Sequence, residues 1–222
     1  MDTLVISLGG SIIVPEEIDT GFLKRFKNII LSLESMRFVI ICGGGRICRR
    51  YQKAAKGISN ISSADLDWIG IGATRLNAEL VRSSFGDKAH QKVIHDPYET
   101  VDGDKQIIIG AGFKPGSSTD LRAVQMAERF NADRVINMSN IDYVYSEDPK
   151  KNPEAVKLKT ISWVDFRRLV GDEWDPGLNM PFDPIASKAA EALALTVVII
   201  GNEINNLERL LKGHHFAGTT IS

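Results

Sequence analysis

The amino-acid sequence predicts an α/β protein in which an open, mostly parallel sheet is sandwiched between helices. Five short runs are almost entirely apolar and rich in β-branched residues, which is typical of parallel strands covered on both faces. Amphipathic stretches separate these runs, and a regular alternation of strands and helices indicates a parallel sheet with right-handed crossovers. Glycine-rich turns follow three of the runs directly, as expected where such strands end at one edge.

The first half of the chain opens with the apolar run LVISL and continues with an amphipathic stretch. That stretch places Phe22, Phe26 and Ile30 at four-residue spacing, so that their side chains share one face of a helix. FVIIC and QIII repeat the apolar pattern of a buried strand. The elements expected here are, in order, strand 4–8, helix 18–33, strand 38–42, helix 46–56, helix 64–84 and strand 106–109.

The second half repeats the alternation around two further apolar runs, RVINM and TVVII. Its loop at 146–153 carries two prolines and four charges and is expected to be exposed. The segment 171–184 carries three prolines and is expected to be an irregular surface loop, of the length found in lids and binding loops. The elements expected here are, in order, helix 120–131, strand 134–138, helix 163–170, helix 184–193, strand 196–200, helix 204–211 and an edge strand at 219–221.

Composition and charge exclude several classes of function. The chain has 222 residues, which suits one large or two small domains, with 27 Lys+Arg against 28 Asp+Glu. This balance argues against a nucleic-acid coat or a polybasic membrane binder, although it permits a local anion site. Two cysteines, Cys42 and Cys48, match no zinc, redox or disulfide pattern, so we expect a reducing cytoplasm.

Membrane insertion and a histidine metal site are likewise not expected. The longest apolar stretch, residues 193–200, is far shorter than the roughly 20 residues that a membrane helix needs. The first residues lack the basic region of a signal peptide, so a soluble protein is expected. The histidines show no metal-binding spacing; they are His90, His95, His214 and His215.

The glycine-rich turns predict a phosphate site. They lie at residues 9–11 (GGS), 43–45 (GGG) and 110–120 (GAGFKPGSSTD). Glycine lets the backbone approach a ligand closely, and N–H groups at the following helix starts point at one region, which suits phosphate. No P-loop motif is present, and GGGRIC is not a dinucleotide fingerprint. The turns therefore indicate two neighbouring anion pockets rather than either standard phosphate fold.

Cations follow the second glycine turn. Arg46, Arg49 and Arg50 occupy the start of the expected helix, where a positive charge opposes the helix dipole. A negatively charged ligand would account for this placement, whereas the alternative is a solvated helix face. We prefer the solvated face for Arg50, and the sequence leaves both interpretations open for Arg49.

The long helix at 64–84 combines glycines with polar side chains. Two internal glycines, Gly70 and Gly72, cost about 1 kcal/mol each relative to alanine. Either they allow close packing of another helix, or they allow a substrate to approach. In the second interpretation this helix offers a carboxylate, a hydroxyl and a guanidinium to a phosphorylated substrate, from Asp67, Thr74 and Arg75.

Taken in order along the chain, these motifs resemble a known family. They are GGS, GGG, DWIGIGATRLNA, PGSSTD, SNIDYVYSEDP, DPIASK and GTTI, and together they span almost the whole sequence. The ordered set is similar to the amino acid kinase superfamily, and within it to uridylate (UMP) kinases of the archaeal type. The resemblance implies one domain over residues 1–222, with the acceptor-binding part at roughly 1–130 and the ATP-binding part at roughly 131–222.

The resemblance also implies roles for individual residues. Gly10 and Ser11 would contact the transferred phosphoryl group and the ATP phosphates, Asp120 would organise the catalytic centre, and Lys188 would approach the ATP phosphates. For Lys188 the alternative is an exposed helix charge. The other implied ATP-binding residues are Gly45, Arg49, Ser139, Asn140, Tyr145 and Asp148. The UMP-binding residues are Gly44, Asp67, Thr74, Arg75, Phe113, Lys114, Pro115, Gly116, Ser117, Ser118 and Thr119.

Three places depart from the family pattern. Many members carry lysine in the first motif, K-x-G-G, where this chain has Ser7. One positive charge must therefore come from elsewhere, and the candidates are Arg49, Lys114 and Lys188. Tyr143 stands where relatives have glycine, and a bulky residue at a turn that needs positive φ would be strained. Phe113 and Lys114 also replace residues that are usually smaller or different, which bears on the choice of acceptor.

The implied reaction is transfer of the γ-phosphoryl group of MgATP to UMP in pyrimidine nucleotide biosynthesis. The resemblance implies that Mg²⁺ is held mainly by ATP and water, and that the protein is a homo-oligomer, a hexamer built from dimers. One alternative is a superfamily kinase for another small molecule. A second alternative is a nucleotide- or oxyanion-binding storage or regulatory protein without catalysis, which the substitutions at Ser7 and Tyr143 favour.

Overall fold

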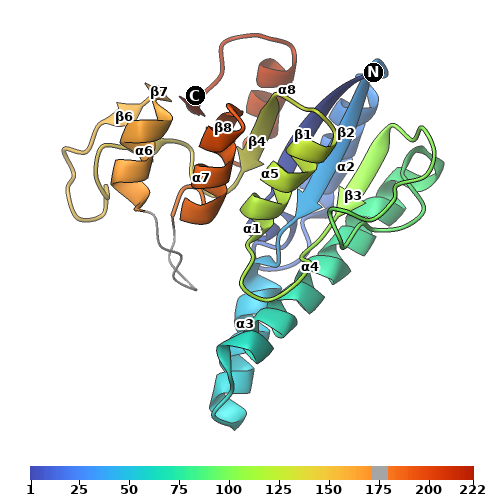
Figure 1. Cartoon of the computed structure of the whole chain (residues 1–222), viewed down its shortest axis with the longest axis horizontal. Coiled ribbons are helices and arrows are strands. Elements are labelled where there is room, and N and C mark those ends of the chain that lie inside the picture. The colour runs from blue at the N-terminus through green and yellow to red at the C-terminus, as the bar shows by residue number, and fades with distance from the viewer. Residues whose placement is uncertain (172–179) are drawn as a thin grey trace.

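The computed structural model describes residues 1–171 and 180–222, and it confirms a mostly parallel sheet between two layers of helices (Figure 1). Its seven strands follow the order β3-β2-β1-β4-β8-β9-β7. The first five in this order are parallel, whereas β9 is antiparallel to β8 and parallel to β7. The strands are β1 (Asp2–Leu8), β2 (Met36–Cys42), β3 (Ile107–Gly110), β4 (Arg134–Met138), β7 (Thr160–Ile161), β8 (Thr196–Ile200) and β9 (Thr219–Ile221).

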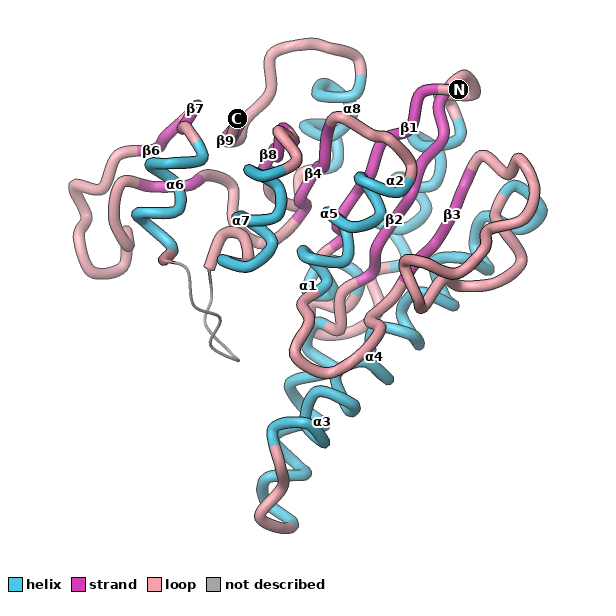
Figure 2. Tube along the Cα trace, viewed as in Figure 1, coloured by secondary structure: helices cyan, strands magenta, loops and turns pink. Residues whose placement is uncertain are grey.

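Helices cover both faces of this sheet (Figure 2). Apolar side chains of α2, α4 and α8 form a core against one face, and those of α5, α6 and α7 form a second core against the other. The helices are α1 (Gly10–Ile13), α2 (Thr20–Leu31), α3 (Gly45–Ile58), α4 (Ser63–Phe85), α5 (Thr119–Arg129), α6 (Trp163–Val170), α7 (Pro184–Ala192) and α8 (Ile204–Leu211), with a 3₁₀ turn at Gly86–Lys88.

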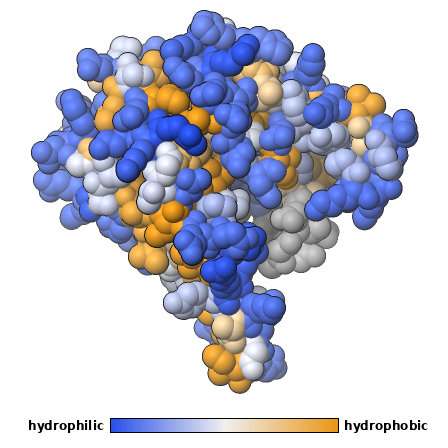
Figure 3. Space-filling model, turned by 180° about the vertical axis from the view of Figure 1, so that it is seen from behind, coloured by the Kyte–Doolittle hydropathy of each residue, from blue (hydrophilic) through white to orange (hydrophobic). Residues whose placement is uncertain are grey.

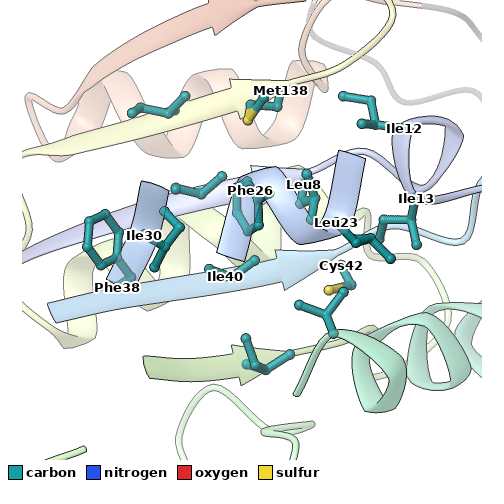
Figure 4. Packing of buried hydrophobic residues seen from close by; sticks show 14 of the residues in the cluster. Leu8, Ile12, Ile13, Leu23, Phe26, Ile30, Phe38, Ile40, Cys42 and Met138 are labelled. Atoms are coloured by element: carbon teal, nitrogen blue, oxygen red, sulfur yellow. The ribbon is translucent and has the colours of Figure 1, made fainter. Parts of the chain in front are cut away.

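The apolar strands serve the two cores alternately, because successive side chains of a strand point to opposite faces. In β2, Ile40 and Cys42 join the core under α2, while Ile41 joins the core under α5. Figure 4 shows Ile40 beside Phe26 and Cys42 beside Leu23, both of these partners in α2. Burial on both faces explains why the sequence of these strands is continuously apolar rather than alternating.

Side-chain caps set the starts of several helices. Asp19, Ser118 and Asp183 each accept a hydrogen bond from a backbone N–H in the first turn of α2, α5 and α7, at 2.8, 3.1 and 2.7 Å. Such a cap stabilises a helix by about 1 kcal/mol because it satisfies an N–H that has no partner inside the helix. The starts of α5 and α7 lie beside each other at the carboxyl edge of the sheet, where the Asp183 N–H donates to the Asp120 carboxylate.

The structure corrects three details of the sequence prediction. The strand at 219–221 lies between β8 and β7 instead of at an edge. Short elements absent from the prediction are α1, β7 and the two-stranded ladder of β5 (Val144–Tyr145) with β6 (Lys157–Leu158). The expected strain at Tyr143 is wrong, because the non-glycine residues with positive φ in the described part are Asn131 and Ala194.

The α3–α4 hairpin projects from the body of the molecule (Figures 1 and 2). None of the residues of α3 is buried, although α3 and α4 contact each other along the projection. Large apolar side chains are exposed along both helices, and Figure 3 shows apolar surface at the free end. They are Tyr51, Ile58, Trp68 and Leu76. The loop predicted over 171–184 lies mostly outside the described residues, because residues 172–179 are not described.

Candidate active site

The first two glycine turns meet at the carboxyl edge of β1 and β2, as predicted. A Cβ atom added to Gly10 would lie 2.2 Å from the Gly45 nitrogen and 2.4 Å from the Gly43 oxygen, so the backbones are in direct contact. Gly45 itself has φ +60°, a conformation that side-chain-bearing residues rarely adopt. Glycine is therefore required at both positions for the two turns to converge.

Backbone N–H groups at this junction are available to a ligand. Within the described part, no turn, loop or side-chain hydrogen bond engages the N–H groups of Gly10, Ser11 or Gly45. The turn at 43–45 is held from behind by Asn77 of α4, whose Nδ2 donates to the carbonyl oxygens of Gly43 and Gly44 at 2.8 and 3.3 Å. The resulting cluster of unpaired amides is suited to an anion such as a phosphate group.

The third glycine turn is hydrogen-bonded to α4 through Asp67, Thr74 and Arg75, the three side chains that we identified in this helix from the sequence. The Gly112 N–H donates to Thr74 Oγ1 at 2.9 Å, and the Gly116 N–H donates to a carboxylate oxygen of Asp67 at 2.8 Å. Arg75 Nη2 lies 3.4 Å from the Phe113 carbonyl oxygen. The predicted acceptor-binding residues of α4 and of the 113–119 segment are thus brought together at one end of the sheet.

Asp120 lies at the carboxyl edge of the sheet, between β1 and the start of α7. Its carboxylate accepts a hydrogen bond from Ser7 Oγ at 3.0 Å and another from the Asp183 N–H at 3.3 Å. Burial raises the pKa of Asp120 to about 6, and the nearby Asp183 carboxylate raises it as well, while the hydrogen bond from Ser7 opposes this shift. Ser7 therefore supplies a neutral donor where many family members carry a cation.

Asp183 has a pKa that is also raised, again because of burial. No lysine or arginine of the described residues forms an ion pair within 4.0 Å of either carboxylate. Two neighbouring carboxyl groups without a paired cation therefore hold their protons more tightly than ordinary carboxyl groups do. A perturbed carboxyl pair in such a position is typical of a functional site.

The arginines after the second turn divide into two kinds. Arg46 and Arg50 both form ion pairs with Glu16, which agrees with a solvated face for Arg50. Arg49 is exposed and forms no ion pair in the described part of the chain. Of the three, Arg49 is therefore the one available to a ligand.

The glycines inside α4 also differ. A Cβ on Gly70 would lie 3.3 Å from Cys48 Sγ of α3, so Gly70 allows close helix packing. A Cβ on Gly72 would meet nothing within 4 Å.

The expected ATP-binding residues follow β4 and occupy the other side of the edge. Ser139 directly follows the strand and caps its own turn, its Oγ accepting from the Ile141 N–H at 3.1 Å. Asn140 and Asp148 are exposed, and Asp148 accepts a hydrogen bond from the Lys150 N–H within its own loop. Ser139 adjoins the first glycine turn, since a Cβ added to Gly9 would lie 3.4 Å from the Ser139 Cα.

Two further expected residues stand apart from the glycine turns. Tyr145 lies in β5, which pairs with β6 outside the main sheet. Lys188 is exposed on α7, one turn and a half beyond Asp183. Its side chain forms no hydrogen bond or ion pair among the described residues, so it is free to reach a ligand.

Sequence reasoning missed three contributions to this site. Asn77 holds the second glycine turn, Asp183 pairs with Asp120, and Arg122 of α5 lies against Phe113 in the third turn. The motif DPIASK was the only signal for Asp183. Asn77 lies within the motif DWIGIGATRLNA, but the motif does not show its contact with Gly43. Arg122 contacts Ser117 and Phe113, which are near in sequence, yet the helical pattern around it gives no sign of its burial.

The described residues were also considered as ligands for a metal ion or as a membrane anchor. They contain no group of three or more His, Cys, Asp or Glu residues that could hold a metal ion. The phosphate site presents backbone amides instead, which fits a magnesium ion that is carried mainly by a nucleotide and its water. Among the helices in the described ranges, none has the length and apolarity to cross a membrane.

Comparison with known proteins identifies the family. The sequence model of the amino acid kinase family matches residues 2–201. A uridylate kinase from Thermococcus kodakarensis is 33% identical over 224 residues, covering 98% of each chain. One from Methanospirillum hungatei is 32% identical, covering 100% of this chain and 95% of the relative. The crystal structure of uridylate kinase from Archaeoglobus fulgidus matches with a TM-score of 0.85 at 33% identity over 100% of both chains. With its glycine turns and sheet order, the chain belongs to the amino acid kinase family.

Proposed function

We propose that the protein is a UMP kinase that transfers the γ-phosphoryl group of ATP to UMP. The observation that carries this proposal is the contact between the first two glycine turns, which gathers unpaired amides at one point. The third turn and α4 add Asp67 and Arg75 beside that point. The full-length similarity to archaeal uridylate kinases supports UMP as the acceptor and a role in pyrimidine nucleotide synthesis.

In the proposed reaction an oxygen of the UMP phosphate attacks the γ-phosphorus of ATP. The bond from that phosphorus to the β–γ bridging oxygen breaks, so UDP forms and ADP leaves. The chain contributes position and charge rather than a covalent nucleophile. The N–H groups of Gly10, Ser11 and Gly45 bind phosphoryl oxygens. Lys188, which lies on α7, neutralises negative charge on the phosphates. The Mg²⁺ that accompanies ATP supplies further neutralisation of the phosphate charge.

The two substrates divide the carboxyl edge between them in this proposal. Residues 1–130 hold UMP, with Gly44 and Arg75 near its phosphate, Asp67 at the ribose, and the 113–119 segment around the nucleotide. Residues 131–222 hold adenosine beside Ser139 and Tyr145. Asp120 lies at the border of the two parts and organises the reacting groups. We place the reaction in a reducing cytoplasm, which the two free cysteines support.

A coupled ADP-release assay across acceptors tests this function. With MgATP as donor, UMP is expected to give a kcat/KM at least about 100-fold above CMP, glutamate and isopentenyl phosphate, because the buried polar groups of the acceptor site would be left unpaired by the wrong ligand. Turnover of another acceptor above UMP would reassign the substrate within the family. Calorimetric binding of ATP without ADP release in the presence of UMP would instead support the non-catalytic binding protein.

We also propose that the enzyme is a homo-oligomer, a hexamer built from dimers, in which the projecting α3–α4 hairpin contacts another copy. The support is apolar exposure on that hairpin: Tyr51 is 68% exposed, Trp68 50% and Leu76 63%.

Light scattering coupled to size exclusion tests the assembly. The double variant Trp68→Lys, Leu76→Lys is expected to elute as a smaller species than the parent, because two charges would be buried at the contact. The matched control Val164→Lys changes an exposed residue of α6 and should leave the mass unchanged. A parent protein that elutes as a monomer would refute the assembly.

A further inference from the structure

Arg122 in the first turns of α5 is in an unusual environment for a cation. Only 3% of the residue is exposed, and it is the one lysine or arginine among the described residues that is buried. In the described part of the chain no carboxylate lies within 4.0 Å of its guanidinium, and its Nε has no hydrogen-bond partner. Buried arginines are normally paired, since an unpaired buried charge costs several kcal/mol.

The contacts of Arg122 are to the third turn and to its own helix. Nη2 donates to Ser117 Oγ at 2.9 Å, and the guanidinium carbon lies 5.0 Å from the centre of the Phe113 ring. Nη1 donates to Gln125 Oε1 at 2.6 Å. A cation over an aromatic face is attracted by the ring, and the attraction is larger where water is excluded. The two ends of the 113–117 segment are therefore both attached to Arg122.

The same segment is attached to α4 on its other side. Arg75 reaches the carbonyl oxygen of Phe113, and Asp67 accepts from the N–H of Gly116, where φ is +74°. These α4 contacts are to the backbone, whereas the Arg122 contacts are to side chains. The segment lies between two helices: it continues into α5 through the cap Ser118, and Arg122 of α5 contacts its side chains.

We propose that Arg122 is a positioning residue for the phosphoryl acceptor: through Phe113 and Ser117 it fixes the shape of the acceptor segment before the acceptor binds. This inference rests on the proposed kinase function, in which the 113–119 segment surrounds UMP. A preformed segment spares the acceptor the entropy of ordering it, so Arg122 contributes to acceptor affinity without touching the acceptor. Burial lowers the pKa of Arg122, while Tyr98 and Asp96 oppose this shift from beyond ion-pair distance.

Steady-state kinetics of Arg122→Met give the first test, because methionine keeps an apolar stem and removes the charge and donors. The KM for UMP is expected to rise about tenfold, while kcat and the KM for ATP stay within about twofold of the parent. Arg122→Lys retains the charge but loses the planar fork, and its KM for UMP should rise only about threefold.

The chain provides a matched control on the same helix. Arg129 also lies over a phenylalanine, 5.4 Å from the Phe130 ring centre, and donates to the Pro97 carbonyl oxygen. It is at the opposite end of α5 from the acceptor segment. Arg129→Met should therefore leave the KM values for UMP and ATP unchanged. Equal effects of Arg122→Met and Arg129→Met on all kinetic constants would show that Arg122 merely stabilises α5, and would overturn the proposal.

Hydrogen exchange separates this inference from the proposed function. In Arg122→Met without ligand, amides of residues 112–118 are expected to exchange about tenfold faster, while those of β1 and β2 keep the parent rate. If the parent turns over no UMP, the proposed function fails, yet exchange still decides whether Arg122 orders the segment. Unchanged exchange at 112–118 in both Arg122→Met and Phe113→Leu would refute the positioning role.

Discussion

Asp120→Asn is expected to lower kcat for UMP phosphorylation by at least about 100-fold while making the protein more stable at pH 7.5. Asparagine has nearly the same shape, so the Ser7 hydroxyl can still donate to it, but the negative charge beside the reacting phosphates is lost. The weak 3.3 Å bond from the Asp183 N–H is lost as well, because an amide nitrogen cannot accept it.

The expected gain in stability follows from the raised pKa of Asp120, about 6 against the ordinary aspartate value of 3.8. Well below pH 3.8 the carboxyl is protonated in folded and unfolded chains alike, and the charge costs nothing. Between pH 4 and 6 the unfolded chain ionises first, so the parent loses stability as the pH rises. Above pH 6 the full cost of about 3 kcal/mol is present, and asparagine removes most of it.

Urea denaturation of the two proteins at pH 4.5 and 7.5 measures this difference. The stability advantage of Asp120→Asn should be about 2 kcal/mol at pH 7.5 and should shrink toward zero at pH 4.5. As a control, Asp148→Asn changes an exposed carboxylate and should give the same small effect at both pH values. A variant that retains a tenth or more of the parent kcat would contradict the catalytic role assigned to Asp120.

Gly10→Ala is expected to abolish measurable activity and to lower the free energy of unfolding by about 3 kcal/mol or more. The new methyl group would lie 2.2 Å from the Gly45 nitrogen and 2.6 Å from the Gly43 carbonyl carbon, both of them backbone atoms. Because backbone cannot rotate away as a side chain does, the two turns must separate. Their amides then no longer converge on one phosphate site.

Gly57→Ala provides the matched control for this prediction. Gly57 lies in α3, and a Cβ there would meet nothing within 4 Å. Alanine should stabilise that helix by about 0.5–1 kcal/mol and leave turnover unchanged. Thermal unfolding and the coupled assay compare the two variants directly. A Gly10→Ala protein with parental activity would show that the contact between the turns is dispensable for phosphate binding.

The main strands of the fold could be predicted because burial on both faces imposes a strong local signal. RVINM and TVVII became β4 and β8 with unchanged bounds. The four-residue helix α1 has no such signal, since four residues are too few to show a helical period. The position of β9 inside the sheet depends on pairing with β7 and β8, which three residues cannot specify by themselves.

Parts of the site could be predicted from the sequence where a residue type has a single structural role. Consecutive glycines after apolar runs indicate close backbone approach, and the contact of Gly10 with Gly45 is such an approach. Arg122 could not be recognised, because it precedes the buried Ala123 and Val124 and reads as an ordinary surface charge of an amphipathic helix. Its burial becomes visible only when Phe113 is placed over it.

The strand at 219–221 joins two parts of the sheet that are synthesised long before it. Thr219 is fully buried; its hydroxyl oxygen accepts from the Val144 N–H and donates to the Leu158 carbonyl, while Ile221 pairs with both Val197 and Ile161. While residues 219–221 are unpaired, the edge of β8 presents free N–H and C=O groups to any other extended segment. Three residues therefore decide whether this side of the sheet is closed or open to pairing with another chain.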